Sequence, residues 1–318
     1  MKSLVLGIGG LIGSAVSAQL ASEQFRHPAQ RKIRWSVLGD ARADLQFLLD
    51  KFFQFVADDR WAIFWCAGKG HLRSLSTEVD VETELFGWVL NLLKAWPNRN
   101  GVVMMCSSAG ALWYSPSVGA ITEQSPDTGT SPYALAKSVQ ETMLHSACLD
   151  SGIRGLAARI STVYGVNQDL SKSQGLISRL CRSATSQQQL DIFVPLETTR
   201  NYIFAPDAAR MMTRLSLFMA DNAPPSAFAR KIICSRESKS IASLCNSVEL
   251  VSRKKPLISC RITPESDSYP LHFQLRSTMT PDLSSFESTT ILSGISAVYH
   301  QLLRQQQLGS LSHTAKVD

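Results

Sequence analysis

The chain has 318 residues, of which 44% are apolar and 18% are charged, and its formal net charge is +6. These proportions are typical of a globular protein with a sizeable buried core, and they exclude wholesale disorder. Because no long run of lysine and arginine occurs, nucleic-acid binding is not indicated, whereas an anionic small ligand is compatible with the charge.

The N-terminal segment predicts a phosphate-binding turn. Residues 3–6 form a short apolar run, the segment Gly7-Ile8-Gly9-Gly10-Leu11-Ile12-Gly13 follows, and residues 15–20 have a helical pattern. A glycine turn between a buried strand and a helix lets the backbone approach a pyrophosphate, with free N–H groups facing it. A glycine-rich turn without a ligand is the alternative. The stretch 4–21 could pass for a signal peptide, but its glycines suit this turn better.

The following segments alternate between apolar runs and helical patterns, which predicts a parallel α/β sheet. Only one clear strand fits between the first helix and residue 61, so we expect one unit of the usual doubly wound half to be missing or shortened. The expected strands are 3–6, 33–38, 61–66, 102–106, 155–160, 190–194, 231–234 and 257–262. The expected helices are 15–20, 44–56, 79–96, one from 132, 175–184, 207–220 and 290–303.

Two charged residues are candidates for the ribose of a dinucleotide. Asp40 lies 27 positions after Gly13, and Arg42 follows two residues later. An acidic residue in such a position would bind the adenosine ribose of NAD, whereas an arginine would suit the 2′-phosphate of NADP. The sequence leaves both alternatives open.

A group of hydroxyl and amine side chains predicts proton-transfer chemistry. Ser107-Ser108 ends a predicted strand, and Tyr133 and Lys137 lie four residues apart on a helix that Ser131-Pro132 can begin. This spacing puts the phenol and the ammonium on one helix face. A nearby positive charge favours the phenolate and lowers the pKa of the tyrosine.

Together, the glycine turn, the serine pair and the YxxxK motif resemble the extended branch of the short-chain dehydrogenase/reductase superfamily. The group is the NAD-dependent epimerase/dehydratase, or nucleotide-sugar epimerase-like, family. Further matches are Ala67-Gly68, the segment 159–165 (RISTVYG) and the segment 200–207 (RNYIFAPD). The resemblance runs from residue 1 to about residue 215 and is looser beyond.

The resemblance implies a Rossmann-type doubly wound parallel sheet with a smaller α+β substrate-binding part at the C-terminal end. Residues 1–165 would form the NAD(P)-binding Rossmann domain, and residues 166–305 would form the substrate-binding part. Residues near 190–215 would return to the Rossmann sheet, and 306–318 would be a flexible tail.

The resemblance also assigns roles to single residues. Tyr133 would be the general base, Lys137 would bind the nicotinamide ribose and lower the pKa of Tyr133, and Ser108 would bond the reacting oxygen. Ser107 is the alternative hydroxyl donor, and it is structural if it points the other way along the strand. Arg200 and Arg276 are candidate contacts to the substrate's diphosphate. The implied dinucleotide contacts are Gly7, Gly10, Leu11, Ile12, Gly13, Asp40, Arg42, Ala67, Gly68 and Lys137.

Two departures from the family pattern bear on the reaction. Sugar dehydratases of this group carry an acidic pair directly after the hydroxyl residue, and here those positions are Ala109 and Gly110. This argues against 4,6-dehydration. The helix position where the group usually has asparagine near the nicotinamide corresponds to Glu84, whose carboxylate would change the cofactor contacts or face elsewhere.

The leading hypothesis is a nucleotide-sugar epimerase that uses NAD or NADP, with NAD favoured, in surface-polysaccharide biosynthesis. The alternatives are an NADPH-dependent 4-keto-sugar reductase and, from another class, a non-catalytic dinucleotide-binding regulator. The seven scattered cysteines lack CxxC or CxxH spacing, which predicts reduced thiols in a cytoplasmic protein without a metal. No run of 18 uninterrupted apolar residues occurs, so no membrane span is expected. The family implies a homodimer through two helices, to which Trp88, Leu92, Met143 and Leu144 would belong.

Overall fold

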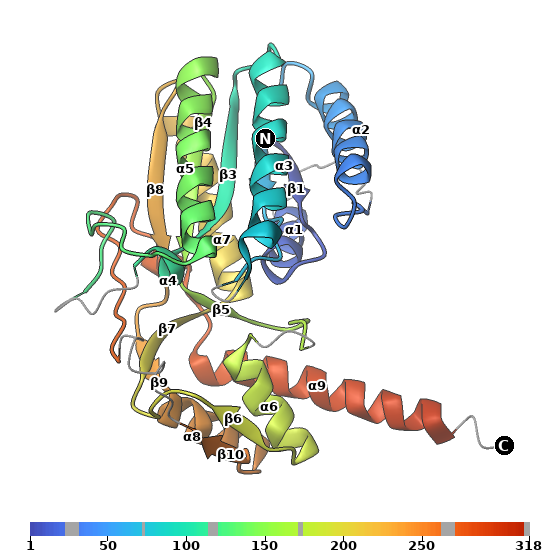
Figure 1. Cartoon of the computed structure of the whole chain (residues 1–318), viewed down its shortest axis with the longest axis vertical. Helices are drawn as coiled ribbons and strands as arrows, with labels where there is room; N and C mark the ends of the chain where they lie inside the picture. Colours follow the sequence, from blue (N-terminus) through green and yellow to red (C-terminus); the bar gives the residue numbers. More distant parts are fainter. Residues whose placement is uncertain (23–31, 72–73, 114–119, 171–173, 262–270, 315–318) are drawn as a thin grey trace.

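The protein has an upper α/β part and a smaller lower part, as the computed structural model shows (Figure 1). The structure describes residues 1–22, 32–71, 74–113, 120–170, 174–261 and 271–314. Within these residues, no helix is both long enough and apolar enough to cross a bilayer.

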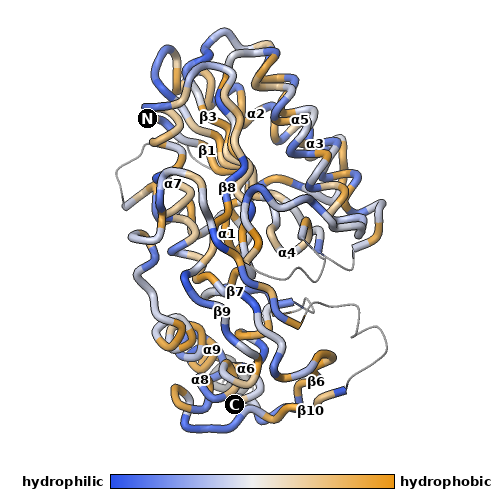
Figure 2. The backbone as a smooth tube through the Cα atoms, turned by 90° about the vertical axis from the view of Figure 1, so that its left-hand side faces the viewer, coloured by the Kyte–Doolittle hydropathy of each residue, from blue (hydrophilic) through white to orange (hydrophobic). Residues whose placement is uncertain are grey.

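The centre of the upper part is a sheet of five parallel strands in the order β1-β2-β3-β4-β8. The central strands are buried from both sides, as all five residues of β2 illustrate, and the tube in Figure 2 is mostly hydrophobic along β1 and β3. The predicted parallel α/β fold is confirmed. The strands are β1 (Lys2–Leu6), β2 (Trp61–Trp65), β3 (Gly101–Ser108), β4 (Arg154–Ile160) and β8 (Phe228–Ile233).

The strand expected at residues 33–38 is wrong, and within the described residues the sheet ends at β1. The cause is local, because the backbone N–H of Arg34 donates to the carboxylate of Asp44 at 3.1 Å instead of to a neighbouring strand. The guanidinium of Arg34 also binds Asp44, which is fully buried. Residues 38–56 then form the helix α2 (Leu38–Val56). The predicted shortening of the first half is therefore real.

Helices cover both faces of the sheet. The helices α2, α3 (Ser76–Ala95) and α5 (Pro132–Ser151) pack on one face, and α1 (Leu11–Ser22) and α7 (Ala205–Asn222) pack on the other. Phe52 of α2 shows the packing, since its fully buried ring meets Trp61 of β2 edge-on. Burying a side chain of this size contributes about 2 kcal/mol. Residues 205–233 thus return to the upper part as α7 and β8.

The lower part consists of short strands and three helices around a separate core. The sequence-based expectation missed most of its strands and the helix α8, although Ser240 caps α8 and its apolar residues recur at helical spacing. The helix α9 continues to Thr314, and the flexible tail expected from residue 306 stays a prediction. Positions 262 and 315–318 lie outside the described residues. The elements are β5 (Thr162–Tyr164), α6 (Leu176–Ser186), β6 (Leu190–Ile192), β7 (Thr199–Phe204), β9 (Ser238–Ser240), α8 (Ile241–Ser252), β10 (Ile258–Cys260), a 3-10 turn (Ser284–Phe286) and α9 (Ile291–Thr314).

A buried ionic network ties β3, β4 and β8 to α5. The carboxylate of Glu141 accepts hydrogen bonds from Arg159 at 2.7 and 3.0 Å and from Arg230 at 2.6 Å. Burial alone would raise the pKa of Glu141, but the bonds from Arg159 and Ser107 lower it below its ordinary value. Because a charge buried without its partner is strongly unfavourable, the network fixes the position of α5 on the sheet.

Candidate active site

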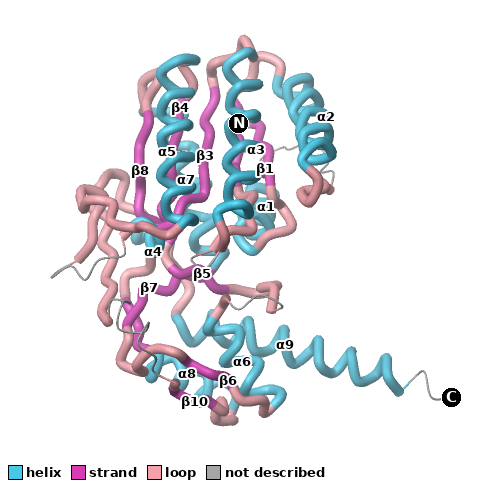
Figure 3. Tube along the Cα trace, in the orientation of Figure 1, coloured by secondary structure: helices cyan, strands magenta, loops and turns pink. Residues whose placement is uncertain are grey.

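The carboxyl ends of the parallel strands meet at one edge of the sheet, and this edge faces the lower part (Figure 3). In parallel α/β sheets this edge is where ligands bind. The predicted serine pair ends β3, and the glycine turn and the start of the YxxxK helix lie in segments that follow the ends of β1 and β3.

The glycine turn after β1 can cradle a phosphate. Gly7 has φ +95°, a left-handed conformation that favours glycine, and its carbonyl accepts a hydrogen bond from Gly10 at 3.0 Å. A Cβ atom on Gly13 would lie only 2.1 Å from the oxygen of Gly7, so Gly13 lets α1 start against the turn. Around Gly9, by contrast, a Cβ would meet nothing within 4 Å. The turn therefore leaves open space in front of a helix N-terminus, which fits the pyrophosphate of a dinucleotide.

Ala67 and Gly68, which follow β2 after Cys66, lie beside the turn. Ala67 is buried, and Gly68 has φ +152° and packs against the carboxylate of Glu82. A Cβ on Gly7 would collide with the backbone of Cys66 and Ala67, which shows how closely the two segments approach. The predicted cofactor residues from β1 and β2 are thus brought together.

Asp40 and Arg42 are placed on α2 and not at the end of a strand. Asp40 pairs with Arg34 at 3.1 Å, and Arg42 pairs with Glu84 at 2.5 Å. Their contacts to the adenosine end of a dinucleotide stay a prediction, and the choice between NAD and NADP is not decided by these two side chains.

The two serines of β3 point to opposite sides, as successive strand residues do. The Ser107 hydroxyl is buried and donates to Glu141 at 2.6 Å, which is the structural role that the sequence left open. The Ser108 hydroxyl accepts a hydrogen bond from the backbone of Ala111 and caps the short helix α4 (Ala109–Leu112). Only Ser108 therefore remains oriented for a ligand at this edge.

Tyr133 and Lys137 occupy the first turns of α5. The Ser131 side chain caps this helix by accepting from the backbone of Ala134 at 3.1 Å, and Pro132 opens it, as the sequence indicated. The Lys137 ammonium lies 5.7 Å from the centre of the Tyr133 ring, and its side chain is almost fully buried. The predicted pair is therefore assembled on one face of the helix.

The structure adds one residue that the sequence reasoning missed. The carboxylate of Glu82 accepts a hydrogen bond from the Lys137 ammonium at 2.6 Å, and both side chains are buried. The acidic residue that the sequence placed near the nicotinamide is Glu84, but Glu84 is half exposed and faces Arg42. The helical spacing of α3 could have pointed to Glu82, because it shares a buried face with Val79, Leu85 and Phe86.

The charges around Tyr133 oppose one another. Burial raises the pKa of its phenol, Lys137 lowers it, and Glu82 raises it again, so that the pKa lies above its ordinary value. For Lys137, burial lowers the pKa, but the attraction of Glu82 and Tyr133 raises it overall. Lys137 therefore stays an ammonium group, and Tyr133 stays a phenol well into the alkaline range.

The candidate substrate contacts lie on neighbouring segments below this edge. Arg200 is on β7 and donates to the carbonyl of Thr199 at 2.7 Å, while Arg276 is exposed. A bridge between Thr199 and His272 places β7 beside the segment that carries Arg276. Their contacts to a diphosphate stay predictions. No group of three or more His, Cys, Asp or Glu residues able to hold a metal occurs in the part of the chain that the structure describes.

Comparisons with known proteins agree with this geometry. The model of the NAD dependent epimerase/dehydratase family matches residues 3–228, which confirms the resemblance seen in the sequence. The chain is 31% identical over 108 residues to a Methanocaldococcus jannaschii protein whose name gives UDP-glucose 4-epimerase as its proposed activity. This match covers 34% of the chain and only 35% of that relative's length.

Two solved structures have the same fold over nearly the whole chain. One is the UDP-glucose 4-epimerase from Brucella ovis in complex with NAD, with a TM-score of 0.78, 17% identity, and coverage of 94% of this chain and 98% of that one. The other is the UDP-glucuronic acid 4-epimerase from Bacillus cereus in complex with UDP-glucuronic acid and NAD. Its TM-score is 0.75 and its identity 20%, and the alignment covers 96% of this chain and 100% of the other.

The glycine turn provides a direct test of the cofactor site. We expect Gly13→Ala to weaken NAD binding at least tenfold, because the added methyl group collides with the Gly7 carbonyl and displaces the turn from α1. Gly39→Ala on α2 is the matched control, since its methyl group meets no atom within 4 Å and lies outside the turn. Isothermal titration with NAD measures both, and equal affinities in the two variants would contradict the assignment.

Proposed function

The chain belongs to the NAD dependent epimerase/dehydratase family, and we propose that it is a nucleotide-sugar epimerase in which Tyr133 is the general base. One observation supports this above all: Ser108, Tyr133 and Lys137 stand at the sheet edge that also carries the glycine turn. Contacts join these groups, because Gly68 packs on Glu82, and Gly70 packs on the Tyr133 ring.

The proposed division of labour follows from the chemistry of each group. A bound NAD supplies the acceptor and donor of hydride. The Tyr133 oxygen would take the proton from a sugar hydroxyl and return it, while Ser108 would donate a hydrogen bond to the same oxygen. Lys137 would hold a ribose hydroxyl of the dinucleotide, and the Gly7–Gly13 turn would hold its phosphates. The absence of acids at Ala109 and Gly110 argues against a dehydratase.

A nucleotide sugar is the proposed substrate. The solved neighbours include epimerases of UDP-glucose and UDP-glucuronic acid, which makes these two compounds the first probes to use. Arg200 and Arg276 are the proposed diphosphate contacts, since a guanidinium group suits phosphate geometry.

A keto-sugar reductase that uses exchangeable NADPH is the second candidate. The observation that favours it is the raised pKa of Tyr133, since a retained phenol suits proton donation to a carbonyl oxygen. An epimerase must keep its cofactor through both half-reactions, whereas a reductase must release it. The rate at which the dinucleotide leaves the protein separates the two.

The role of Tyr133 is tested by removing only its hydroxyl group. Tyr133→Phe should lower turnover of the UDP-sugar that the wild type accepts by about 10²- to 10⁴-fold, with NAD affinity nearly unchanged, because proton transfer contributes on this scale. Tyr299→Phe is the control, since this buried tyrosine of α9 lies in the core of the lower part. Undiminished turnover in Tyr133→Phe would contradict the mechanism.

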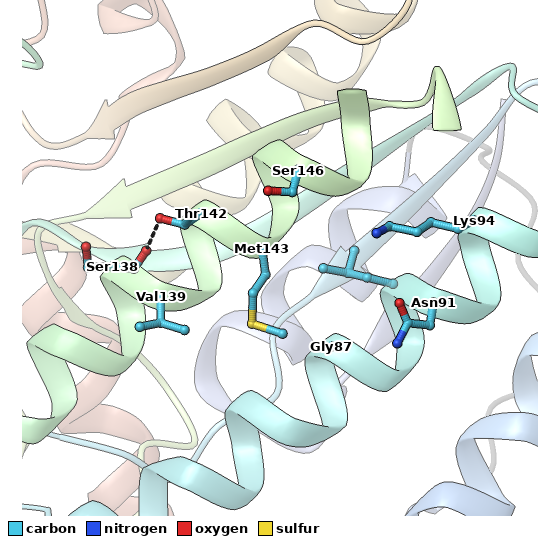
Figure 4. Close-up of a pocket in the computed structure, with 9 residues that line it drawn as sticks. Gly87, Asn91, Lys94, Ser138, Val139, Thr142, Met143 and Ser146 are labelled. Atoms are coloured by element: carbon cyan, nitrogen blue, oxygen red, sulfur yellow. Dashed lines mark hydrogen bonds between the residues drawn. The ribbon is translucent and has the colours of Figure 1, made fainter. Parts of the chain in front are cut away.

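We also propose a homodimer through α3 and α5. A groove of about 370 Å³ runs between these helices, where Met143 reaches across to Gly87 (Figure 4). Exposed apolar side chains continue this face, because Leu135 and Val139 are each about half exposed. Of the residues expected at the interface, Leu144 belongs to the core, and Trp88, Leu92 and Met143 are partly buried against it.

The dimer is tested by placing a charge on this face. Val139→Glu should shift the protein to a monomer in analytical ultracentrifugation at micromolar concentration, because a carboxylate would have to be desolvated in the interface. Leu250→Glu is the control, since Leu250 is similarly exposed on the remote helix α8. A wild-type protein that sediments as a monomer would refute the dimer.

A further inference from the structure

Glu82 and Lys137 form a buried ion pair that the proposed reaction has not yet used. Their side chains are 7% and 5% exposed, and Oε1 of Glu82 lies 2.6 Å from the Lys137 ammonium. Gln140 completes the cluster by accepting from Lys137 at 3.1 Å and by donating to Glu82 at 3.3 Å and to Thr83 at 3.0 Å. The pair therefore joins α3 to α5 directly beside the tyrosine.

We propose that Glu82 is a positioning residue that acts through Lys137: its carboxylate compensates the ammonium charge and so opposes ionisation of Tyr133. This inference rests on the function proposed above only for the catalytic role of Tyr133. It concerns this chain's own residues and applies to the free protein.

The geometry carries the inference. A lone ammonium 5.7 Å from the ring would stabilise the phenolate strongly, because electrostatic interactions are weakly screened in a buried site. With a carboxylate 2.6 Å from that ammonium, the phenol faces an ion pair of zero net charge instead of a cation. Glu82 therefore removes most of the driving force by which a lysine would ionise the tyrosine.

The remaining groups around Tyr133 do not replace this effect. From β3, a hydrogen bond from Ser108 lowers the pKa of Tyr133, and Cys106 raises it. The Sγ atom of Cys106 lies 3.5 Å from that of Cys66 on β2. The hydrogen bond to Cys106 and burial raise the pKa of the Cys66 thiol well above its ordinary value, so the Cys66 thiol stays neutral. Among the groups that act on the pKa of Tyr133, Lys137 and Glu82 are the two that carry full and opposite charges.

A second observation separates this role from simple stabilisation of the fold. Within the described residues, Oε2 of Glu82 has no hydrogen-bond partner, although it is buried against Gly68. A buried carboxylate oxygen that no protein group bonds lowers the stability of the folded state. The position is therefore poorly explained by stability and better explained by its effect on Lys137.

The consequence for the reaction is directional. A protonated Tyr133 is ready to give a proton to a carbonyl oxygen, whereas it must first ionise to accept one from a hydroxyl group. The resting protein is thus prepared for the half-reaction that reduces a keto sugar. In an epimerase this is the second half-reaction, and in a reductase it is the whole reaction.

The test is an alkaline titration of the free protein, followed by tyrosinate absorbance. Subtracting the Tyr133→Phe curve isolates Tyr133 from the other five of the six tyrosines. The same subtraction is made for Glu82→Gln, with the double variant Glu82→Gln/Tyr133→Phe as its reference. The titration midpoint of Tyr133 should then lie about one pH unit lower than in the wild type, because the uncompensated Lys137 ammonium favours the phenolate. An unchanged midpoint would overturn the proposal.

Glu84→Gln is the matched control. It removes a carboxylate from the same helix two residues away, but Glu84 is half exposed and pairs with Arg42. Its midpoint should equal that of the wild type. If Glu84→Gln lowered the midpoint as much as Glu82→Gln, the effect would reflect overall charge and not the buried pair.

The double variant Glu82→Gln/Lys137→Gln covers the case in which Glu82→Gln alone does not fold. It leaves no uncompensated charge, so its Tyr133 midpoint should lie close to that of the wild type. A midpoint about one pH unit higher would mean that Lys137 acts uncompensated in the wild type, which would refute the proposal. Because the titration uses neither cofactor nor substrate, its result is independent of whether the chain is an epimerase.

Discussion

Parallel pairing of the five strands is the constraint on which the site depends. The five strands β1, β2, β3, β4 and β8 run in one direction, so their carboxyl ends lie at one edge of the sheet. The glycine turn after β1 and the serine pair at the end of β3 therefore lie at this same edge. The buried Glu141 then fixes α5 against this edge through Arg159, Arg230 and Ser107. The tyrosine and the lysine thereby acquire a fixed place relative to the turn.

The site differs from its family's pattern in the charges that surround this fixed arrangement. The lysine that would promote ionisation of Tyr133 is bound to Glu82, and residues 33–38 form no strand beside β1. On the proposal made above, the ion pair favours the protonated form of Tyr133.

The sequence predicted the upper part well because its signals are local. Apolar runs such as 61–65 and the cap at Ser131 specify a buried strand and a helix start without help from distant residues. Glu82 was missed because its partner Lys137 lies 55 positions away, although the spacing of α3 places Glu82 on a buried face. The strand expected at 33–38 failed for a local reason, since the backbone of Arg34 donates to Asp44, ten positions further on.

The most direct test of the central claim, that this site holds NAD through a catalytic cycle, is mass spectrometry of the small molecules that the freshly purified protein releases on denaturation. We expect about one NAD per protein molecule, because an epimerase keeps its cofactor between turnovers. A co-released nucleotide sugar would in addition identify the substrate class. Release of no dinucleotide, together with no binding of NAD or NADPH on later titration, would contradict the account.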